Sequence, residues 1–556
     1  MIRVVCDRKK IFDKTGLDVV GQTISGSLFR DCRVKSFLLI TPGGHFFVIA
    51  DNLDRGDFEY RAKNVTRYFF TKTYLTYSGA NGTPREDEYP DYVEAFRAAA
   101  HRETLILPGD MAVDTYGDLS VAFDILDDFT DAPFKTYTLY TRNLKTVLAQ
   151  IHENDDVIEK KAFELICSEC AKTILKPYLF DRRDTRYESL NAHMAEQGVA
   201  SLLFASPMNI QEIAALNFDE LTEKEVYAFY NAYDEQVYVV SSTPLDFARD
   251  MTPLGTNLSL REAFSAMDRS GPIGIEEESL TIARFRELNL APANVKPFTK
   301  MLRVWRENRS AEDLPYYIVI ARTTAYAIDG AKAWAEEEYY ADRRFTEHDV
   351  FAEYDRLKYA FIEKNNIPIR LATYDPCTYS SDRSEYPCVH TEFLIPASAG
   401  SVRIDIGEFA KDKYGYIQAT SDIARTVCLN PVVRKTHDFL LKVLRNDIIP
   451  NIRSGMKYSE IWSQGTKPIF EAQDMLKEMD MIPEHVELSD LYMRNIGHGM
   501  AKQTRTANFI TKQNENCLPK ACVGNIELPF NFRHNMVAVE DMWFCTPEGT
   551  VNITID

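Results

Sequence analysis

The stretch RIDIGEFAKDKYGYIQATSDIARTV, residues 403–427, carries two aspartates in strand-like surroundings on either side of a turn. Before the turn, Asp405 alternates with Arg403 and Gly407, so these three residues share one face of the predicted strand and the isoleucines occupy the other. The segment KDKYGY supplies turn residues for a hairpin, and the second predicted strand carries Asp422. A hairpin can place two strand carboxylates side by side.

Two further segments supply a histidine and a third acid. In RNIGHGMAKQTRT (494–506), His498 stands between two glycines, and taken alone it is an ordinary histidine in a tight turn. In HNMVAVEDMWFC (534–545), Glu540 stands in the middle of an apolar predicted strand, where a lone glutamate needs a partner.

The two aspartates alone are equally consistent with solvated acids at a sheet edge, although adjacent like charges favour a cation between them. Taken together, the two aspartates, the histidine and the glutamate form a set of oxygen donors with one imidazole. Such a set suits Mn²⁺, Fe²⁺, Zn²⁺ or Co²⁺.

The order D-x-G, S-D-I-x-R-T, G-H-G and V-E resembles the pita-bread metallopeptidase superfamily, which includes methionine aminopeptidase, aminopeptidase P, prolidase and creatinase. The resemblance implies that Asp405, Asp422, His498 and Glu540 are metal ligands, and that His498 and Glu540 also serve in catalysis. It further implies one or two divalent ions, with manganese among the candidates, although a creatinase-like relative has none. The terminal Asp556 is the acid available for the last ligand position.

Other positions match the family pattern only in part. CVHTEFLIP (388–396) resembles the segment with the substrate-facing histidine, which implies a catalytic and substrate-binding role for His390. The family's second histidine falls at Arg505, which stays protonated and can instead bind a substrate carboxylate or phosphate. Asp541 replaces the usual proline, and strand alternation puts Thr554 at the final glutamate position. The two hairpin aspartates are 17 positions apart (405 to 422), longer than the family's usual spacing.

The remaining chain predicts mixed α/β structure. Residues 34–50 read as a strand, a turn and a strand, and residues 190–216 as a helix, a glycine stop, a buried strand and a second helix. Residues 320–341 and 345–365 have helical periodicity, with Thr346 as the N-cap of the second helix.

We therefore predict a fold of the α/β and α+β classes in three domains. The first is an N-terminal α/β domain over residues 1–150, and the second is a creatinase-N-like α/β domain over residues 151–300. The third is a C-terminal pita-bread catalytic domain over residues 301–556. The layout is similar to three-domain aminopeptidase P.

Composition excludes some partners. The chain has 64 Lys+Arg against 83 Asp+Glu, a net charge of -19, without a long basic run, which disfavours nucleic acids and acidic membranes. The N-terminus lacks the apolar core of a signal peptide, and no stretch approaches a spanning helix.

Cys167 and Cys170 form a lone CxxC, which we expect to be buried in one amphipathic helix over AFELICSECAKTILK. We expect a cytoplasmic protein that forms a homodimer.

Three functions stay open, because a fold alone does not fix a reaction. The first is a metal-dependent hydrolase resembling aminopeptidase P or prolidase, which acts on a small peptide or amide through a metal-activated water. The second is a creatinase-like hydrolase or lyase with one or no metal, in which His390 is the general base and Glu540 holds a cationic group. The third is an inactive pita-bread binding protein, as in the FACT histone chaperone. Retention of four ligand-type residues argues against the third.

Overall fold

The computed structural model describes most of the chain after residue 150 and parts of the chain before it. The described residues are 3–5, 36–40, 46–51, 65–70, 88–89, 94–95, 97–99, 124–125, 134–140, 151–232, 236–245, 252–257, 259–265, 271–280, 282–381, 394–482, 484–485, 487–491, 495–502, 504–532 and 535–555.

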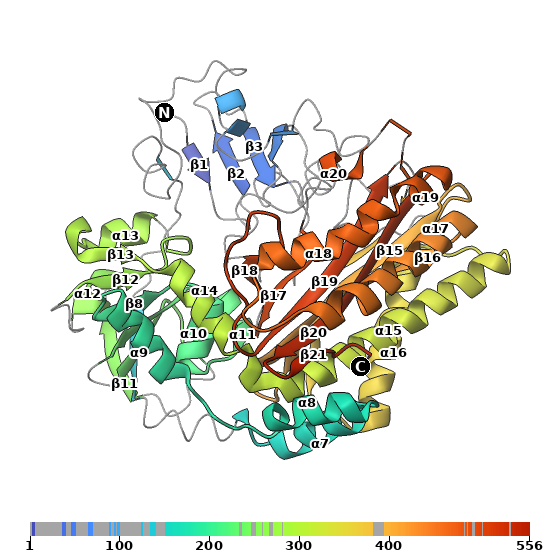
Figure 1. The fold of residues 1–556 in the computed structure, drawn as a ribbon. Helices are drawn as coiled ribbons and strands as arrows, with labels where there is room; N and C mark the ends of the chain where they lie inside the picture. The colour runs from blue at the N-terminus through green and yellow to red at the C-terminus, as the bar shows by residue number, and fades with distance from the viewer. Residues whose placement is uncertain are drawn as a thin grey trace.

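Strands from the N-terminal part of the chain form a first sheet in the order β5-β4-β3-β2-β1-β6. Three of them, β1, β2 and β3, are labelled in Figure 1. The prediction for residues 34–50 is confirmed, since β2 and β3 are antiparallel neighbours. The strands are β1 (Arg3–Val5), β2 (Ser36–Ile40), β3 (Phe46–Asp51), β4 (Val65–Phe70), β5 (Glu88–Tyr89) and β6 (Asp124–Ile125).

A second sheet has the order β11-β7-β10-β9-β8-β12-β13. The prediction for residues 190–216 is confirmed, because α9, β8 and α10 follow one another there. The strands are β7 (Phe134–Tyr140), β8 (Ser201–Phe204), β9 (Val226–Asn231), β10 (Gln236–Ser241), β11 (Thr252–Asn257), β12 (Ile273–Ile275) and β13 (Val295–Pro297). The helices are α9 (Arg186–Glu196), α10 (Pro207–Ala214), α11 (Phe218–Glu223), α12 (Leu260–Ser265), α13 (Ile282–Leu288), η4 (Pro292–Asn294) and α14 (Thr299–Asn308).

The C-terminal part contains two further sheets, with the orders β14-β15-β16 and β18-β17-β19-β20-β21. The strands are β14 (Arg370–Ser380), β15 (Ser401–Lys411), β16 (Ile417–Cys428), β17 (His498–Ala501), β18 (Thr504–Phe509), β19 (Cys522–Phe532), β20 (Asn535–Thr546) and β21 (Gly549–Asn552). Strand β16 packs against β20, which brings the two sheets together.

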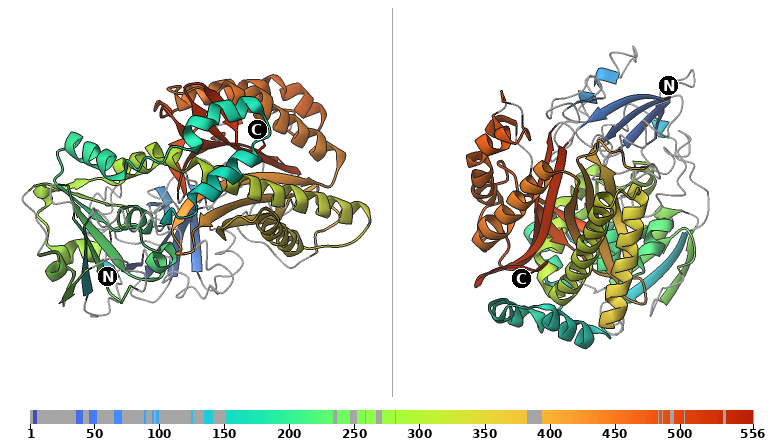
Figure 2. Two further views of the ribbon diagram at one scale, coloured as in Figure 1. Left: turned by 90° about the horizontal axis from the view of Figure 1, so that it is seen from below. Right: turned by 90° about the vertical axis from the view of Figure 1, so that its right-hand side faces the viewer.

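Helices flank these two sheets (Figure 2). The long helices α15 (Leu314–Tyr340) and α16 (Glu347–Asn365) lie side by side, and α15 packs on β15 and β16. The predicted cap of α16 is confirmed, because the Thr346 side chain accepts from the Asp349 backbone in a capping box. Helix α17 packs on β20. The other elements are η5 (Ser310–Asp313), α17 (Pro431–Lys442), the π-helical turn η7 (Val443–Ile448), η8 (Ile449–Asn451), α18 (Tyr458–Glu471), α19 (Gln473–Glu478) and α20 (Leu488–Leu491).

The structure corrects the expectation for the CxxC segment. Two helices, α7 (Asp155–Leu165) and α8 (Glu169–Leu179), replace the single expected helix, because Ser168 caps the second one by accepting from the Ala171 backbone. Cys167 and Cys170 are exposed free thiols, so the expectation of buried thiols was wrong. Both helices pack on the C-terminal part of the chain, α7 on α15 and α8 on β21 (Figure 2).

The domain limits at residues 150 and 300 stay predictions. Strand β7 precedes residue 150 and is nevertheless paired into the second sheet between β10 and β11. The segment ETLILPGD (103–110), whose apolar run predicts a short strand, lies outside the described residues.

A buried ionic cluster joins the second sheet region to the C-terminal part. The Lys502 ammonium, in the turn after β17, lies 2.9 Å from an Asp313 carboxylate oxygen and 3.9 Å from Glu212 of α10. Arg309 donates to the same Glu212 at 2.6 Å. Burial opposes the charge on Glu212, but these cations outweigh it and hold its pKa below the ordinary value. The cluster therefore links the two parts through buried charge pairs.

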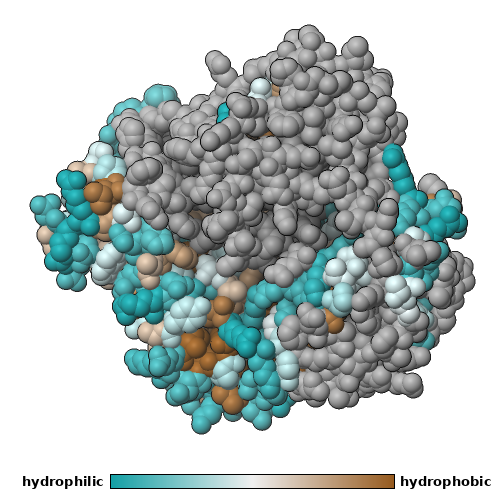
Figure 3. Space-filling model, turned by 180° about the vertical axis from the view of Figure 1, so that it is seen from behind, coloured by the Kyte–Doolittle hydropathy of each residue, from teal (hydrophilic) through white to brown (hydrophobic). Residues whose placement is uncertain are grey.

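Figure 3 shows one face of the molecule, seen from behind. The coloured residues on this face are mostly hydrophilic, with a compact hydrophobic area in the lower part. Among the described residues, no helix combines the length and apolarity needed to cross a membrane.

Candidate metal centre

Glu540 occupies the middle of β20 and is buried. One carboxylate oxygen, Oε1, accepts a hydrogen bond from the Asn525 amide, while Oε2 has no hydrogen-bond partner. Burial and then the nearby Asp422 carboxylate raise the pKa of Glu540 well above its ordinary value. A buried carboxylate with an orphaned oxygen requires a proton or a cation.

The turn before β17 fixes His498. Gly497 has a φ of 141°, and a Cβ atom there would lie 2.2 Å from the Asn525 carbonyl oxygen, so only glycine fits. The His498 backbone N–H donates to Asn525 Oδ1 at 2.8 Å. His498 Nδ1 lies 3.1 Å from the Gly499 carbonyl oxygen, which can only accept, so Nδ1 carries the proton. Nε2 therefore carries the lone pair, which can accept from a donor or bind a metal ion.

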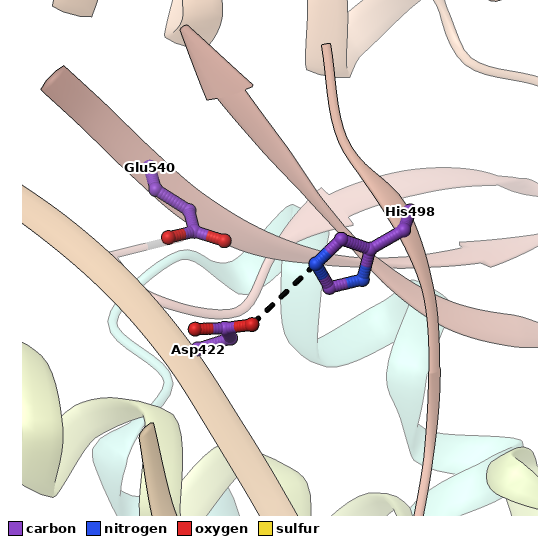
Figure 4. A group of neighbouring side chains, drawn as sticks. All are labelled: Asp422, His498 and Glu540. Atoms are coloured by element: carbon purple, nitrogen blue, oxygen red, sulfur yellow. Dashed lines mark ion pairs between the residues drawn. The ribbon is translucent and has the colours of Figure 1, made fainter. Parts of the chain in front are cut away.

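Asp422, His498 and Glu540, which we call the ligand triad, converge from β16, β17 and β20 (Figure 4). Each offers one ligand atom, all three atoms lie within 4.8 Å of one another, and all three residues are buried. His498 Nε2 is 3.4 Å from Asp422 Oδ2. Two carboxylates and an imidazole at this separation fit one divalent cation.

Asp405 lies beside the ligand triad rather than within it. The predicted hairpin of β15 and β16 is present, but Asp405 pairs with Ala424 and Asp422 pairs with Gly407. The two aspartates are therefore diagonal neighbours on one face, not directly opposite as expected, because the register differs by two residues. The Asp405 carboxylate accepts from Arg403 two residues earlier on the same strand.

Packing explains why position 407, in the D-x-G pattern, is a glycine. A Cβ atom on Gly407 would lie 2.1 Å from the Tyr374 ring, which covers this position. The Tyr374 hydroxyl donates to the Ser421 carbonyl oxygen at 2.6 Å, which fixes the ring beside the strand that carries Asp422.

Two polar residues of this site were missed by the sequence analysis, and both lie on β19. Glu527 is directly opposite Glu540 in the register of β19 and β20, and Asn525 lies two residues before it on the same face. The Asn525 Nδ2 atom is 2.9 Å from His498 Nε2 and also donates to Glu540. The available signal was two polar residues at alternate positions, Asn525 and Glu527, in the largely apolar run CVGNIELPFNF, a signal of the kind that identified Glu540.

Thr554 and Asp541, two residues near the C-terminal end of the domain, have hydrogen-bond partners. The Thr554 hydroxyl accepts from the Met542 backbone N–H at 2.8 Å, so this side chain is engaged with β20. Asp541, which follows Glu540 on β20, is buried and accepts from Arg425 and from Arg445 at 2.7 Å. Burial alone would raise the pKa of Asp541, but the two arginines outweigh it and lower that pKa.

Three predicted site residues cannot be placed in the site. His390 and Asp556 lie outside the described residues. The backbone of Arg505 is in β18 opposite Met500, and its side chain lies outside what is described. Their predicted roles stay predictions.

Comparison with known proteins agrees with this geometry. Residues 319–547 match the model of metallopeptidase family M24, Peptidase_M24. None of the curated proteins matches the chain.

The solved structures that the chain matches include a prolidase from Pyrococcus horikoshii OT3, with 18% identity, a TM-score of 0.48 and coverage of 67% of this chain and 98% of that one. A Xaa-Pro dipeptidase from Bacillus anthracis has 14% identity, a TM-score of 0.47 and coverage of 67% and 97%. The N-terminal domain of FACT complex subunit SPT16 from Cicer arietinum (chickpea) has 12% identity, a TM-score of 0.48 and coverage of 66% and 95%. Identities this low do not transfer an activity.

The fold, the order of the motif segments and the family match agree on one assignment. The chain is a mixed α/β protein whose C-terminal part, over residues 319–547, is a pita-bread domain of metallopeptidase family M24.

Proposed function

We propose that this protein is a metal-dependent hydrolase that acts on a short peptide or small amide, in the manner of aminopeptidase P or prolidase. The observation that carries the proposal is the ligand triad, whose three buried ligand atoms lie within 4.8 Å of one another. The orphaned Oε2 atom of Glu540 supports it, because a divalent cation would satisfy that oxygen.

The residues of the triad have distinct tasks in this proposal. A divalent cation bound there would polarise the scissile carbonyl and make a water molecule nucleophilic. Asp422 and Glu540 supply charge that holds the cation, and His498 supplies Nε2 because its Nδ1 proton is engaged by the Gly499 carbonyl oxygen. The three triad residues are buried, which strengthens their electrostatic interactions with a bound cation.

Three further residues belong to the proposal. We assign to His390 the transfer of a proton in the reaction, and to Arg505 the binding of the anionic end of the substrate. Asp556 is the remaining candidate for a last metal ligand. We also propose that the metal is Mn²⁺, Fe²⁺, Zn²⁺ or Co²⁺, and that the protein is a cytoplasmic homodimer.

Metal content and hydrolysis of Xaa-Pro dipeptides test the proposal together. After equilibrium dialysis against Mn²⁺, we expect the wild-type chain to bind at least one ion and to hydrolyse some member of a dipeptide panel. Glu540→Gln should lose both properties, because it removes a charged ligand. Glu408→Gln is the matched control, since Glu408 is a buried glutamate on β15 that pairs with Lys358 away from the triad. A wild-type chain that binds no divalent ion would contradict the proposal.

One observation favours a second candidate, a metal-free member of the family that binds a ligand or cleaves a C–N bond. The Asn525 amide donates to both Glu540 Oε1 and His498 Nε2, so it satisfies two triad atoms without a cation. Wild-type protein without bound metal, yet stable and monodisperse, would favour this candidate.

A further inference from the structure

Arg403 lies among the acidic side chains next to the ligand triad. It is on β15, it is buried, and it alternates with Asp405 on one strand face. Its Nη2 atom donates to Asp405 and lies 3.1 Å from Glu527 Oε1 of the neighbouring sheet. Its Nη1 atom donates to the Tyr379 hydroxyl at 3.3 Å, so the guanidinium is held from two sides.

The acids around Arg403 form one electrostatic group with the triad. Glu527 is directly opposite Glu540 across β19 and β20, and Asp405 is the diagonal neighbour of Asp422 across β15 and β16. Four carboxylates at such separations require positive charge among them.

We infer that Arg403 takes the place of a second metal ion, so that the site holds a single divalent cation on Asp422, His498 and Glu540. The inference rests on the proposed function. A second ion would have to use the Asp405 and Glu527 oxygens that the guanidinium already contacts. It would also meet the charge of an arginine, which cannot be released by deprotonation.

The charges on the two sides of the site differ. On one side, the Arg403 guanidinium offsets one of the two negative charges of Asp405 and Glu527. The triad side retains the orphaned oxygen of Glu540, which a cation can still satisfy.

The test counts ions per chain by equilibrium dialysis against Mn²⁺ followed by elemental analysis. Arg403→Met removes the charge and keeps an apolar side chain, so we expect it to bind one more Mn²⁺ per chain than wild type. Arg403→Lys retains a positive charge and should bind the wild-type number. Arg445→Met is the matched control, because Arg445 pairs with Asp541, which keeps Arg425 as a partner. This control should not change the count.

The outcomes separate the inference from the proposed function. The wild-type count tests the function, whereas the difference between Arg403→Met and wild type tests the inference. A wild-type count of two, or no gain in Arg403→Met, would overturn the role of Arg403 even if the wild type binds metal. An empty wild type would reject the proposed function and the single-cation site together, whatever the count in Arg403→Met. If Arg403→Met does not fold, Glu527→Gln decides: an unchanged count supports the inference, and a lower count overturns it.

Discussion

Glu527 and Glu540 lie directly opposite each other on the antiparallel strands β19 and β20, with both side chains on the face of the candidate metal centre. Their charges are compensated in different ways. Glu527 has the Arg403 guanidinium at 3.1 Å, whereas Glu540 has the neutral Asn525 amide at Oε1 and nothing at Oε2. The Glu540 side of the site therefore has the most to gain from a divalent cation, and this asymmetry underlies the first prediction.

Asn525→Ala should lower the stability of the metal-free protein and raise its affinity for Mn²⁺. The amide satisfies His498 and Glu540, and each buried group left unpaired costs about 1–3 kcal/mol. The same amide competes with a cation for His498 Nε2. Thermal unfolding with and without Mn²⁺ measures both effects. Asn552→Ala is the control, because Asn552 pairs with Asp541 and should affect stability alone. An Mn²⁺ affinity that falls in Asn525→Ala would contradict the competition.

Gly497→Ala should destabilise the protein more than Gly255→Ala. Both glycines have a φ near +140°, so both substitutions carry the same backbone strain of about 1–3 kcal/mol. A Cβ atom at position 497 would also meet the Asn525 backbone, whereas nothing lies within 4 Å of a Cβ atom at position 255. Overpacking adds about 1–3 kcal/mol, measurable by urea unfolding. If both variants lose the same free energy of unfolding, the contact of a Cβ atom at position 497 with the Asn525 backbone does not affect stability.

Lys502→Met should destabilise the protein by about 3–5 kcal/mol, because it leaves buried carboxylates without their cation. Asp313 would lose its partner at 2.9 Å, and its pKa is already raised by burial and by Glu212. The double variant Lys502→Met/Asp313→Asn should recover a substantial part of the loss in chemical denaturation. A double variant as unstable as the sum of the single changes would show that the pair is not coupled.

His437→Leu should make the protein less sensitive to acid. Burial lowers the pKa of His437 to about 4 from an ordinary value of about 6.5. The unfolded chain therefore binds a proton between these values while the folded chain does not, so this group reduces stability as pH falls from 6.5 to 4. Melting temperatures across that range should fall less in His437→Leu than in wild type. His348→Leu, at an exposed histidine, should retain the wild-type slope. If the melting temperature falls equally with pH in wild type and in His437→Leu, His437 does not cause the loss of stability in acid.

The sequence by itself determined the local elements and the identity of the triad segments. Alternation predicted the strand around Glu540, turn residues predicted the hairpin between β15 and β16, and a side-chain cap predicted the start of α16 at Thr346. These features depend on neighbours within a few positions, so they can be read locally. The prediction of one continuous helix through the CxxC segment was wrong. The Ser168 side chain caps a new helix there, although the apolar periodicity of the sequence continues across that point.

Only the tertiary structure decided how the charges of the site are shared. Strand register put Asp405 diagonal to Asp422, and the approach of two sheets brought Arg403 to Glu527, which is 124 positions away in the chain. Asn525 reached His498 only because β17 and β19 are neighbours. Register and sheet contact are set by packing of the whole domain, and a shift of two residues changes every pair while leaving the hydrophobic alternation of each strand intact.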